Sequence, residues 1–161
     1  LNSTKYHVIA PSILSTKTGE NLNPYMVKPI NIIGKLYYSI FYFNPITARL
    51  IYNIKKMLQQ LFYMLFNKPI PKSGRIYAPQ GSFIIFSNNY FLRGGYIDNN
   101  FKLFGEEIST AEIALKNNLE IHFLPELEVS HVEHSSMGTN YWSYWFYFSK
   151  ETYKYLKKKY L

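Results

Sequence analysis

One segment with strong helical periodicity, residues 44–67, limits the architectures open to this chain. Asn44 and Pro45 form a typical N-cap and first helical residue, and prolines at 69 and 71 end the segment. Between them, apolar side chains recur at helical spacing: Ile46, Leu50, Ile54, Met57, Leu58, Leu61 and Leu65. Lysine and glutamine side chains fall on the opposite side. The pattern predicts a long amphipathic helix with a basic outer face, which either packs on the domain core or lies on a membrane surface.

Strand-like and helix-like segments alternate along the rest of the chain. The expected strands cover residues 6–14, part of 75–86, 120–124 and 129–132, with Pro125 between the last two. The expected helices cover residues 106–118 and a C-terminal helix at 141–161, which ends in lysine-rich turns. This alternation predicts a single α/β domain over residues 1–161.

The residues before the long helix leave two alternatives open. Residues 25–43 crowd tyrosine and phenylalanine side chains together, as in GKLYYSIFYF, and they fit either a strand or an aromatic lid. Together with the long helix, they make residues 25–72 a candidate helical and aromatic insertion.

Charge and cysteine content exclude several classes of protein. The 18 Lys and Arg residues exceed the 10 Asp and Glu residues, so the net charge of +8 favours anionic partners. The absence of cysteine excludes a disulfide scaffold, a cysteine-ligated zinc site and a thiol nucleophile. Glycine-rich phosphate loops and a serine-nucleophile elbow are also missing. RNA-binding motifs are missing too, so we expect no nucleic acid partner.

No apolar run in the chain is long enough to span a membrane, and its start does not have the pattern of a targeting signal. We therefore expect a cytoplasmic protein. The basic helix and the lysine-rich tail make peripheral contact with the inner face of the membrane a further expectation.

Two adjacent carboxylates stand where the helix at 106–118 begins. Glu106 and Glu107 follow Gly105, and the free N–H groups and dipole of a helix N-terminus stabilise a carboxylate there. A carboxylate held in this way can accept a proton from a hydroxyl group, which is the work of a general base. The alternative is that both residues only favour the first helical turn.

Two imidazoles, His131 and His134, lie close together near the end of the last expected strand, with Glu133 between them. Imidazole and carboxylate groups are ligands for divalent metals. On a strand, however, positions 131 and 134 point to opposite faces, so both can ligate one metal only where the chain turns. Polar packing is the alternative.

Six short motifs occur in a fixed order between residues 81 and 136. In chain order they are Gly81-Ser82 before an apolar run, Gly94-Gly95-Tyr96 with Asp98, the aromatic segment 101–104, Gly105-Glu106-Glu107, Pro125, and His131 with His134 and Ser136. This set resembles the C-terminal half of family 2 glycosyltransferases. The aromatic segment 141–150 is similar to the closing helix of these enzymes, and residues 6–14 are similar, more weakly, to the strand after their metal-binding motif.

The resemblance implies the C-terminal, acceptor-side portion of a GT-A fold, with a mixed sheet flanked by helices. It implies a bacterial, rhamnosyltransferase-like hexosyltransferase of polysaccharide biosynthesis. Such an enzyme transfers a sugar from a nucleotide-diphosphate sugar to a glycan or lipid-linked acceptor, with inversion. The cofactor implied for the full-length enzyme is a divalent metal, Mg²⁺ or Mn²⁺.

The resemblance also implies roles for individual residues. Glu107 matches the base that deprotonates the acceptor hydroxyl, and Glu106 supports its position and charge. His131 or His134 matches a histidine near the metal and diphosphate. The implied acceptor- or donor-binding residues are Gly81, Ser82, Tyr96, Asp98 and Trp145.

The chain departs from the family in one respect that affects activity. The family holds its metal with an Asp-x-Asp motif in an N-terminal, nucleotide-binding half, whereas this chain has a single aspartate, Asp98. We therefore expect a fragment that binds no metal by itself and is inactive in isolation. The alternative hypothesis is a non-catalytic module that binds a membrane surface or a partner chain, or forms a homodimer through an uncovered apolar face.

Overall fold

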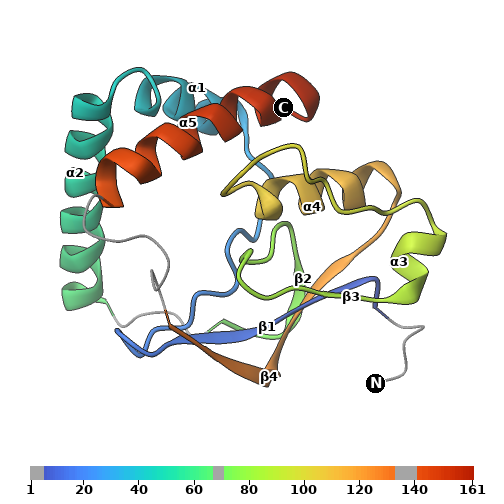
Figure 1. The fold of residues 1–161 in the computed structure, drawn as a ribbon. Helices are drawn as coiled ribbons and strands as arrows, with labels where there is room; N and C mark the ends of the chain where they lie inside the picture. The colour runs from blue at the N-terminus through green and yellow to red at the C-terminus, as the bar shows by residue number, and fades with distance from the viewer. Residues whose placement is uncertain (1–5, 67–70, 133–140) are drawn as a thin grey trace.

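The computed structural model describes residues 6–66, 71–132 and 141–161. The elements in chain order are β1 (Val8–Ser15), α1 (Ile32–Phe41), α2 (Pro45–Leu65), β2 (Gly74–Ile76), β3 (Ile85–Phe86), α3 (Asn88–Leu92), α4 (Glu106–Lys116), β4 (Ile121–His131) and α5 (Tyr141–Lys159). Figure 1 shows the strands as one layer, with α4 above them and α1 and α5 farther out. The α/β class predicted from the sequence is confirmed.

The sheet is mixed, with the strand order β2-β4-β1-β3. Its two long central strands, β1 and β4, run parallel, and the short outer strands pair antiparallel with them. The register between β1 and β4 shifts after the Pro11–Leu124 pair, because the next pair is Ser12–Glu128. The sheet is therefore irregular at Pro125, a residue that has no N–H to donate to a neighbouring strand.

Two strand predictions are corrected by this topology. The two short strands expected around Pro125 are one continuous strand, β4, because the register shift accommodates the proline. The single strand expected within residues 75–86 is instead two short strands on opposite edges of the sheet, β2 and β3. The loop between these two strands carries Gly81 and Ser82.

The main hydrophobic core lies between α4 and the sheet. One side of α4 buries apolar residues, and the parallel strands contribute buried residues below it. The largest fully buried side chains of this core include Tyr90, Phe123, Ile113, Leu119 and Val8. This packing fixes the axis of α4 and so determines where its N-terminal carboxylates lie.

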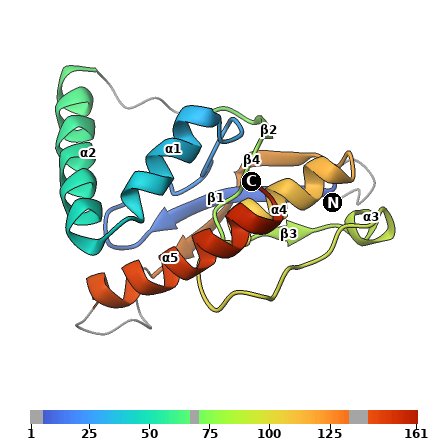
Figure 2. The same ribbon diagram turned by 90° about the horizontal axis from the view of Figure 1, so that it is seen from above.

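The aromatic segment before α2 forms a helix, α1, so the strand that was one of two alternatives for residues 25–43 is wrong for residues 32–41. Asn31 caps α1, because its side-chain oxygen accepts a hydrogen bond from the Gly34 N–H at 2.8 Å. Viewed from above, α5 passes over the sheet (Figure 2), and its Tyr153 ring stacks on Tyr42 with centroids 4.9 Å apart. Aromatic contacts therefore join α1 to α5.

The long amphipathic helix forms as predicted, as α2. The Asn44 side chain accepts hydrogen bonds from the N–H groups of Ile46 and Thr47, both at 2.9 Å, and Pro45 opens the helix. The prediction that its apolar side packs on the core is wrong. Ala48 is the only residue of α2 that is buried among those that the structure describes.

A buried asparagine connects the register shift in the sheet to the loop with Gly81. Asn23 is 1% exposed. Its side-chain N–H donates to the Pro11 carbonyl at 2.9 Å, and its side-chain oxygen accepts from the Gln80 N–H at 2.8 Å. Buried backbone groups are normally paired in this way, so Asn23 positions the residues next to Gly81.

We predict that Asn23→Ala lowers the free energy of unfolding by about 3 kcal/mol, because the buried Pro11 carbonyl and the half-buried Gln80 N–H both lose their partner. Urea denaturation followed by circular dichroism measures this change. The matched control is Asn53→Ala on the exposed surface of α2, which should change the free energy by no more than about 0.5 kcal/mol. A loss of less than about 1 kcal/mol for Asn23→Ala would contradict the assignment.

Candidate active site

The Glu107 carboxylate lies in the first turn of α4 and is held by backbone N–H groups on both of its oxygens. Oε1 accepts from Gly81 at 3.1 Å, and Oε2 accepts from Gly105 at 3.3 Å. Gly105, the residue before α4, has a φ of 144°, which favours glycine. The carboxylate therefore connects the start of α4 to the loop between β2 and β3.

Gly81 permits this approach because it has no side chain. A Cβ atom at position 81 would lie 2.8 Å from Oε1 of Glu107 and 3.3 Å from Cβ of Glu106. Both distances are shorter than ordinary contacts, so any larger residue would push the loop away from the carboxylate. Position 81 therefore needs glycine because the Glu107 carboxylate approaches so closely, and not because of its backbone conformation.

Burial raises the pKa of Glu107, and the negative charge of Glu106 raises it further. The hydrogen bonds from the backbone N–H groups act in the opposite direction without cancelling the effect of burial. A carboxylate with a raised pKa is a stronger base than an ordinary glutamate side chain. This arrangement suits a group that must take a proton from a hydroxyl.

Tyrosines from α1, from the residues on either side of it and from α5 line the cavity in front of Glu107. The cavity has a volume of about 80 Å³, and its lining includes Tyr25, Tyr38, Tyr42 and Tyr153 together with Glu107. Burial raises the pKa of both Tyr38 and Tyr42. Their hydroxyl groups are therefore neutral at physiological pH and can donate hydrogen bonds.

A second cavity, of about 290 Å³, lies on the other side of the start of α4. It brings together four of the residues predicted from the sequence: Gly81, Ser82, Asp98 and Glu106. Gly81 lines this cavity, and its N–H donates to Glu107, which lines the tyrosine cavity. The start of α4 thus lies between a small tyrosine-lined cavity and a larger one.

Asp98 occupies a structural position, because hydrogen bonds from this chain surround its side chain. Oδ1 accepts from the Asn100 backbone N–H at 3.1 Å and side-chain amide at 2.7 Å. Oδ2 accepts from Tyr155 at 2.7 Å, Lys159 at 2.9 Å and Tyr160 at 2.6 Å. Burial alone would raise the pKa of Asp98, but these hydrogen bonds outweigh burial and hold the pKa well below its usual range.

The predicted aromatic residues lie at the edges of this region. Tyr96 is 44% exposed, and its hydroxyl lies 3.2 Å from that of Tyr160. Trp145 is half-buried, with its ring centroid 6.0 Å from Phe41 and 6.4 Å from Phe104, a residue that lines the tyrosine cavity. Trp145 therefore supports the wall of that cavity through Phe104.

Of the two histidines predicted to ligate a metal, the structure describes only His131. His131 is the last residue of β4 and pairs with Ser15 of β1. His134 lies outside the described residues. Within residues 6–66, 71–132 and 141–161, no cluster of three or more His, Asp or Glu side chains could hold a metal ion.

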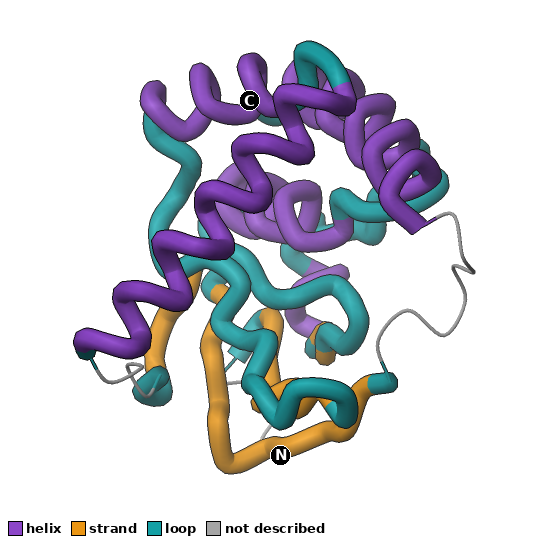
Figure 3. The backbone as a smooth tube through the Cα atoms, turned by 90° about the vertical axis from the view of Figure 1, so that its left-hand side faces the viewer, coloured by secondary structure: helices purple, strands orange, loops and turns teal. Residues whose placement is uncertain are grey.

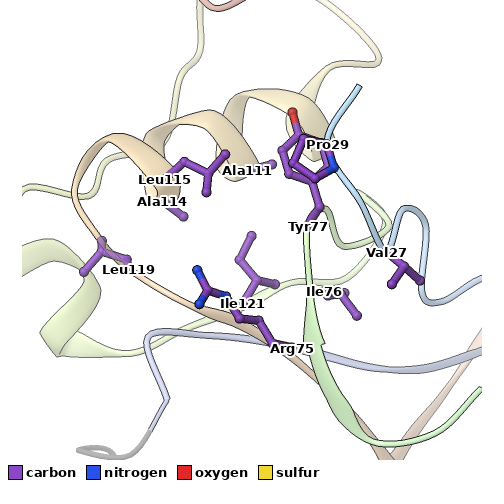
Figure 4. Close-up of a pocket in the computed structure, with 10 residues that line it drawn as sticks. All are labelled: Val27, Pro29, Arg75, Ile76, Tyr77, Ala111, Ala114, Leu115, Leu119 and Ile121. Atoms are coloured by element: carbon purple, nitrogen blue, oxygen red, sulfur yellow. The ribbon is translucent and has the colours of Figure 1, made fainter. Parts of the chain in front are cut away.

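A third cavity, of about 230 Å³, lies between α4, the strands β2 and β4 and residues 27–29 (Figure 4). Its lining is mostly apolar, and Arg75 at its edge pairs with Glu120 at 3.0 Å. None of its lining residues is a carboxylate or a histidine. The tyrosine-lined cavity is therefore the stronger candidate for a catalytic site.

The tyrosines around Glu107 were not identified from the sequence. Residues 25–43 showed a concentration of aromatic side chains, but nothing in the pattern indicated which rings meet the start of α4. Tyr153 lies more than forty residues after Glu107, so its role depends on how α5 folds back over the sheet.

No family model, no curated protein and no solved structure matches this chain.

We predict that the Glu107 carboxyl titrates above the ordinary glutamate pKa of about 4.3. Carbon-13 NMR of the side-chain carboxyl measures this pKa directly. Because the folded-state pKa is raised, folding is favoured most when pH is below the unfolded-state pKa. The contribution of Glu107 to stability is then lost as pH rises through the folded-state pKa.

The same effect is visible in a variant. The free energy of unfolding of Glu107→Gln, relative to the unsubstituted chain, should increase between pH 4 and pH 7, because glutamine has no proton to lose. A Glu107 pKa at or below the ordinary glutamate value would contradict this prediction. So would a difference in free energy of unfolding, between Glu107→Gln and the unsubstituted chain, that stays constant from pH 4 to pH 7.

Proposed function

We propose that this chain carries the acceptor side of a family 2 glycosyltransferase of GT-A fold. It would act in the transfer of a sugar from a nucleotide-diphosphate sugar to a glycan or lipid-linked acceptor, as in bacterial polysaccharide synthesis. The observation that carries the proposal is the Glu107 carboxylate, which lies at the N-terminus of α4 with a raised pKa and faces a cavity lined by tyrosines. The ordered motifs between residues 81 and 136 support it.

The position of Glu107 relative to the sheet also supports the proposal. The chain passes from α4 directly into β4, so α4 runs antiparallel to it and its N-terminal end points toward the carboxyl ends of the parallel strands β1 and β4 (Figure 1). In α/β proteins, ligands bind outside the carboxyl ends of parallel strands. Glu107 lies on this side of the molecule.

In the proposed reaction Glu107 acts as a general base. Its carboxylate accepts the proton of an acceptor hydroxyl, and the oxygen forms a bond to the anomeric carbon of the donor sugar. The bond from that carbon to the diphosphate breaks on the opposite face, so the nucleoside diphosphate leaves with the bonding electrons and the configuration is inverted. Each transfer leaves one proton on Glu107, which is released to solvent.

The sizes of the two cavities suggest how an acceptor would be held. Small-molecule sites usually measure about 300–1,000 Å³. The tyrosine-lined cavity, at about 80 Å³, admits only the reacting edge of a sugar, whereas the cavity beside Ser82 and Glu106, at about 290 Å³, approaches that range. We assign the first cavity to the acceptor hydroxyl and the second to neighbouring parts of the substrate.

The described residues do not provide a complete metal site, so no step of this proposal depends on a metal. The resemblance places the metal and the nucleotide in a half of the enzyme that contains Asp-x-Asp, and the only aspartate here, Asp98, is enclosed by hydrogen bonds from its own chain. The role of His131 and His134 at a metal stays a prediction.

The test begins with the coding sequence upstream of Leu1, because residues 1–161 alone are expected to be inactive. The full-length protein is then assayed with nucleotide-diphosphate sugars, Mg²⁺ or Mn²⁺, and a lipid-linked glycan acceptor. We predict that Glu107→Gln lowers kcat at least about 100-fold, because the acceptor hydroxyl keeps its proton. The KM for the donor should change little.

Glu126→Gln is the matched control, since Glu126 is an exposed carboxylate on β4. It should retain kcat within about twofold, as expected of a surface substitution. A Glu107→Gln enzyme with near-normal kcat would exclude the role of general base. A full-length protein with no transferase activity on any donor would exclude the function itself.

A further inference from the structure

The helix α2 turns an apolar stripe away from the rest of the protein. Five large apolar side chains recur along it at spacings of three, four and seven residues, which places them on one side of a helix. They are exposed by 80% at Ile46, 59% at Leu50, 54% at Met57, 49% at Leu61 and 84% at Met64.

The opposite side of α2 faces the protein. Ala48 is fully buried, and it lies two residues from both Ile46 and Leu50, which is about half a turn on a helix. Tyr52, four residues after Ala48, contacts the Trp142 ring of α5 at 5.6 Å between centroids. In Figure 3, which views the molecule from this side, α2 lies across the front with no described element over it.

The neighbouring helix α1 has an exposed apolar side as well. Its side chains are exposed by 82% at Ile32, 62% at Leu36 and 52% at Ile40, while Phe41 points inward and is buried. The exposed stripe of α2 and this side of α1 are together called the outer helical face. Monomeric soluble proteins rarely expose so many large apolar side chains on adjacent elements.

The stretch of chain that carries the outer helical face has charges of a single sign. Residues 21–97 contain no Asp or Glu. The exposed cations Arg49 and Lys56 border the stripe on α2, and Lys28 and Lys72 flank the two helices in the sequence. A helix with an apolar stripe bordered by cations is the pattern that binds at the interface of an anionic membrane, where the apolar side chains enter the lipid and the cations meet the headgroups.

We propose that the outer helical face docks on the surface of an anionic lipid bilayer. The helices lie along this surface, because no helix that the structure describes is long and apolar enough to cross a membrane. A second copy of the chain fits less well, because a symmetric contact through the stripe would bring the Arg49 and Lys56 cations of both copies into one interface. The proposal does not depend on the transferase function, since it rests on exposure and charge alone.

The test is sedimentation of the chain with vesicles, without any sugar donor or acceptor. Vesicles of phosphatidylglycerol mixed with phosphatidylcholine should bind it, and vesicles of phosphatidylcholine alone should bind it at least about tenfold more weakly. Binding to the mixed vesicles should also weaken as salt concentration rises.

Two variants of α2 separate the apolar contribution from the charged one. Leu50→Ser combined with Leu61→Ser should weaken binding to the mixed vesicles at least about tenfold, and Arg49→Glu combined with Lys56→Glu should do the same. Since all four residues are exposed, circular dichroism should show an unchanged fold.

Matched controls use similar residues elsewhere on the surface. Leu92 and Ile97 are exposed by 76% and 61%, so Leu92→Ser combined with Ile97→Ser removes comparable apolar surface away from α1 and α2. Lys157→Glu combined with Lys158→Glu reverses an exposed lysine pair at the end of α5. Both controls should keep binding within about threefold of the unsubstituted chain.

Several results would overturn the proposal. Equal loss of binding in the α2 and α5 charge variants would show general attraction by net charge instead of docking through α2. Absence of binding to the mixed vesicles would exclude the membrane. A dimer in analytical ultracentrifugation that dissociates on Leu50→Ser combined with Leu61→Ser, in a chain that does not bind vesicles, would assign the face to a second copy.

Discussion

The position of α5 depends on the hydrogen bonds that converge on one buried carboxylate, Asp98. Tyr155, Lys159 and Tyr160, all from the last turns of the chain, donate to the same oxygen of this side chain. A fourth link is the Thr152 hydroxyl, which donates to the Leu103 carbonyl at 2.7 Å. The loop before α4 and the C-terminal helix are thereby fixed to each other. Without these links, α5 would have mainly aromatic packing to hold it over the sheet.

Because α5 is fixed in this way, it can complete the cavity in front of Glu107. Its Tyr153 faces α1 and lines the cavity, and the Ser39 hydroxyl of α1 lies 3.0 Å from the Tyr153 hydroxyl. The other side of the carboxylate is held by Gly81, whose loop is positioned by Asn23. Glu107 therefore occupies the point where three separate parts of the chain meet, and its raised pKa is a consequence of this enclosure.

The elements that could be predicted from the sequence are those specified by local signals. Cap residues and apolar spacing identified α2 and α4, because these features act within a few residues. The helix α1 was missed although Ile32, Leu36 and Ile40 recur at helical spacing, because the crowded tyrosine and phenylalanine side chains of residues 25–43 also fit a strand or a lid. The exposed side of α2 could not be predicted either, because periodicity defines an apolar stripe but not what covers it. The tyrosines around Glu107 required the tertiary position of α5.

The uneven attachment of α2 has a consequence for the dynamics of the protein. From residue 55 to residue 65 every side chain except Tyr63 is exposed, so this half of the helix is maintained mainly by its own backbone hydrogen bonds. Local opening there costs little compared with opening of α4, whose buried side belongs to the main core. Amide protons of α2 should therefore exchange with solvent along a gradient, slowest near Ala48 and fastest toward Leu65, within one continuous helix.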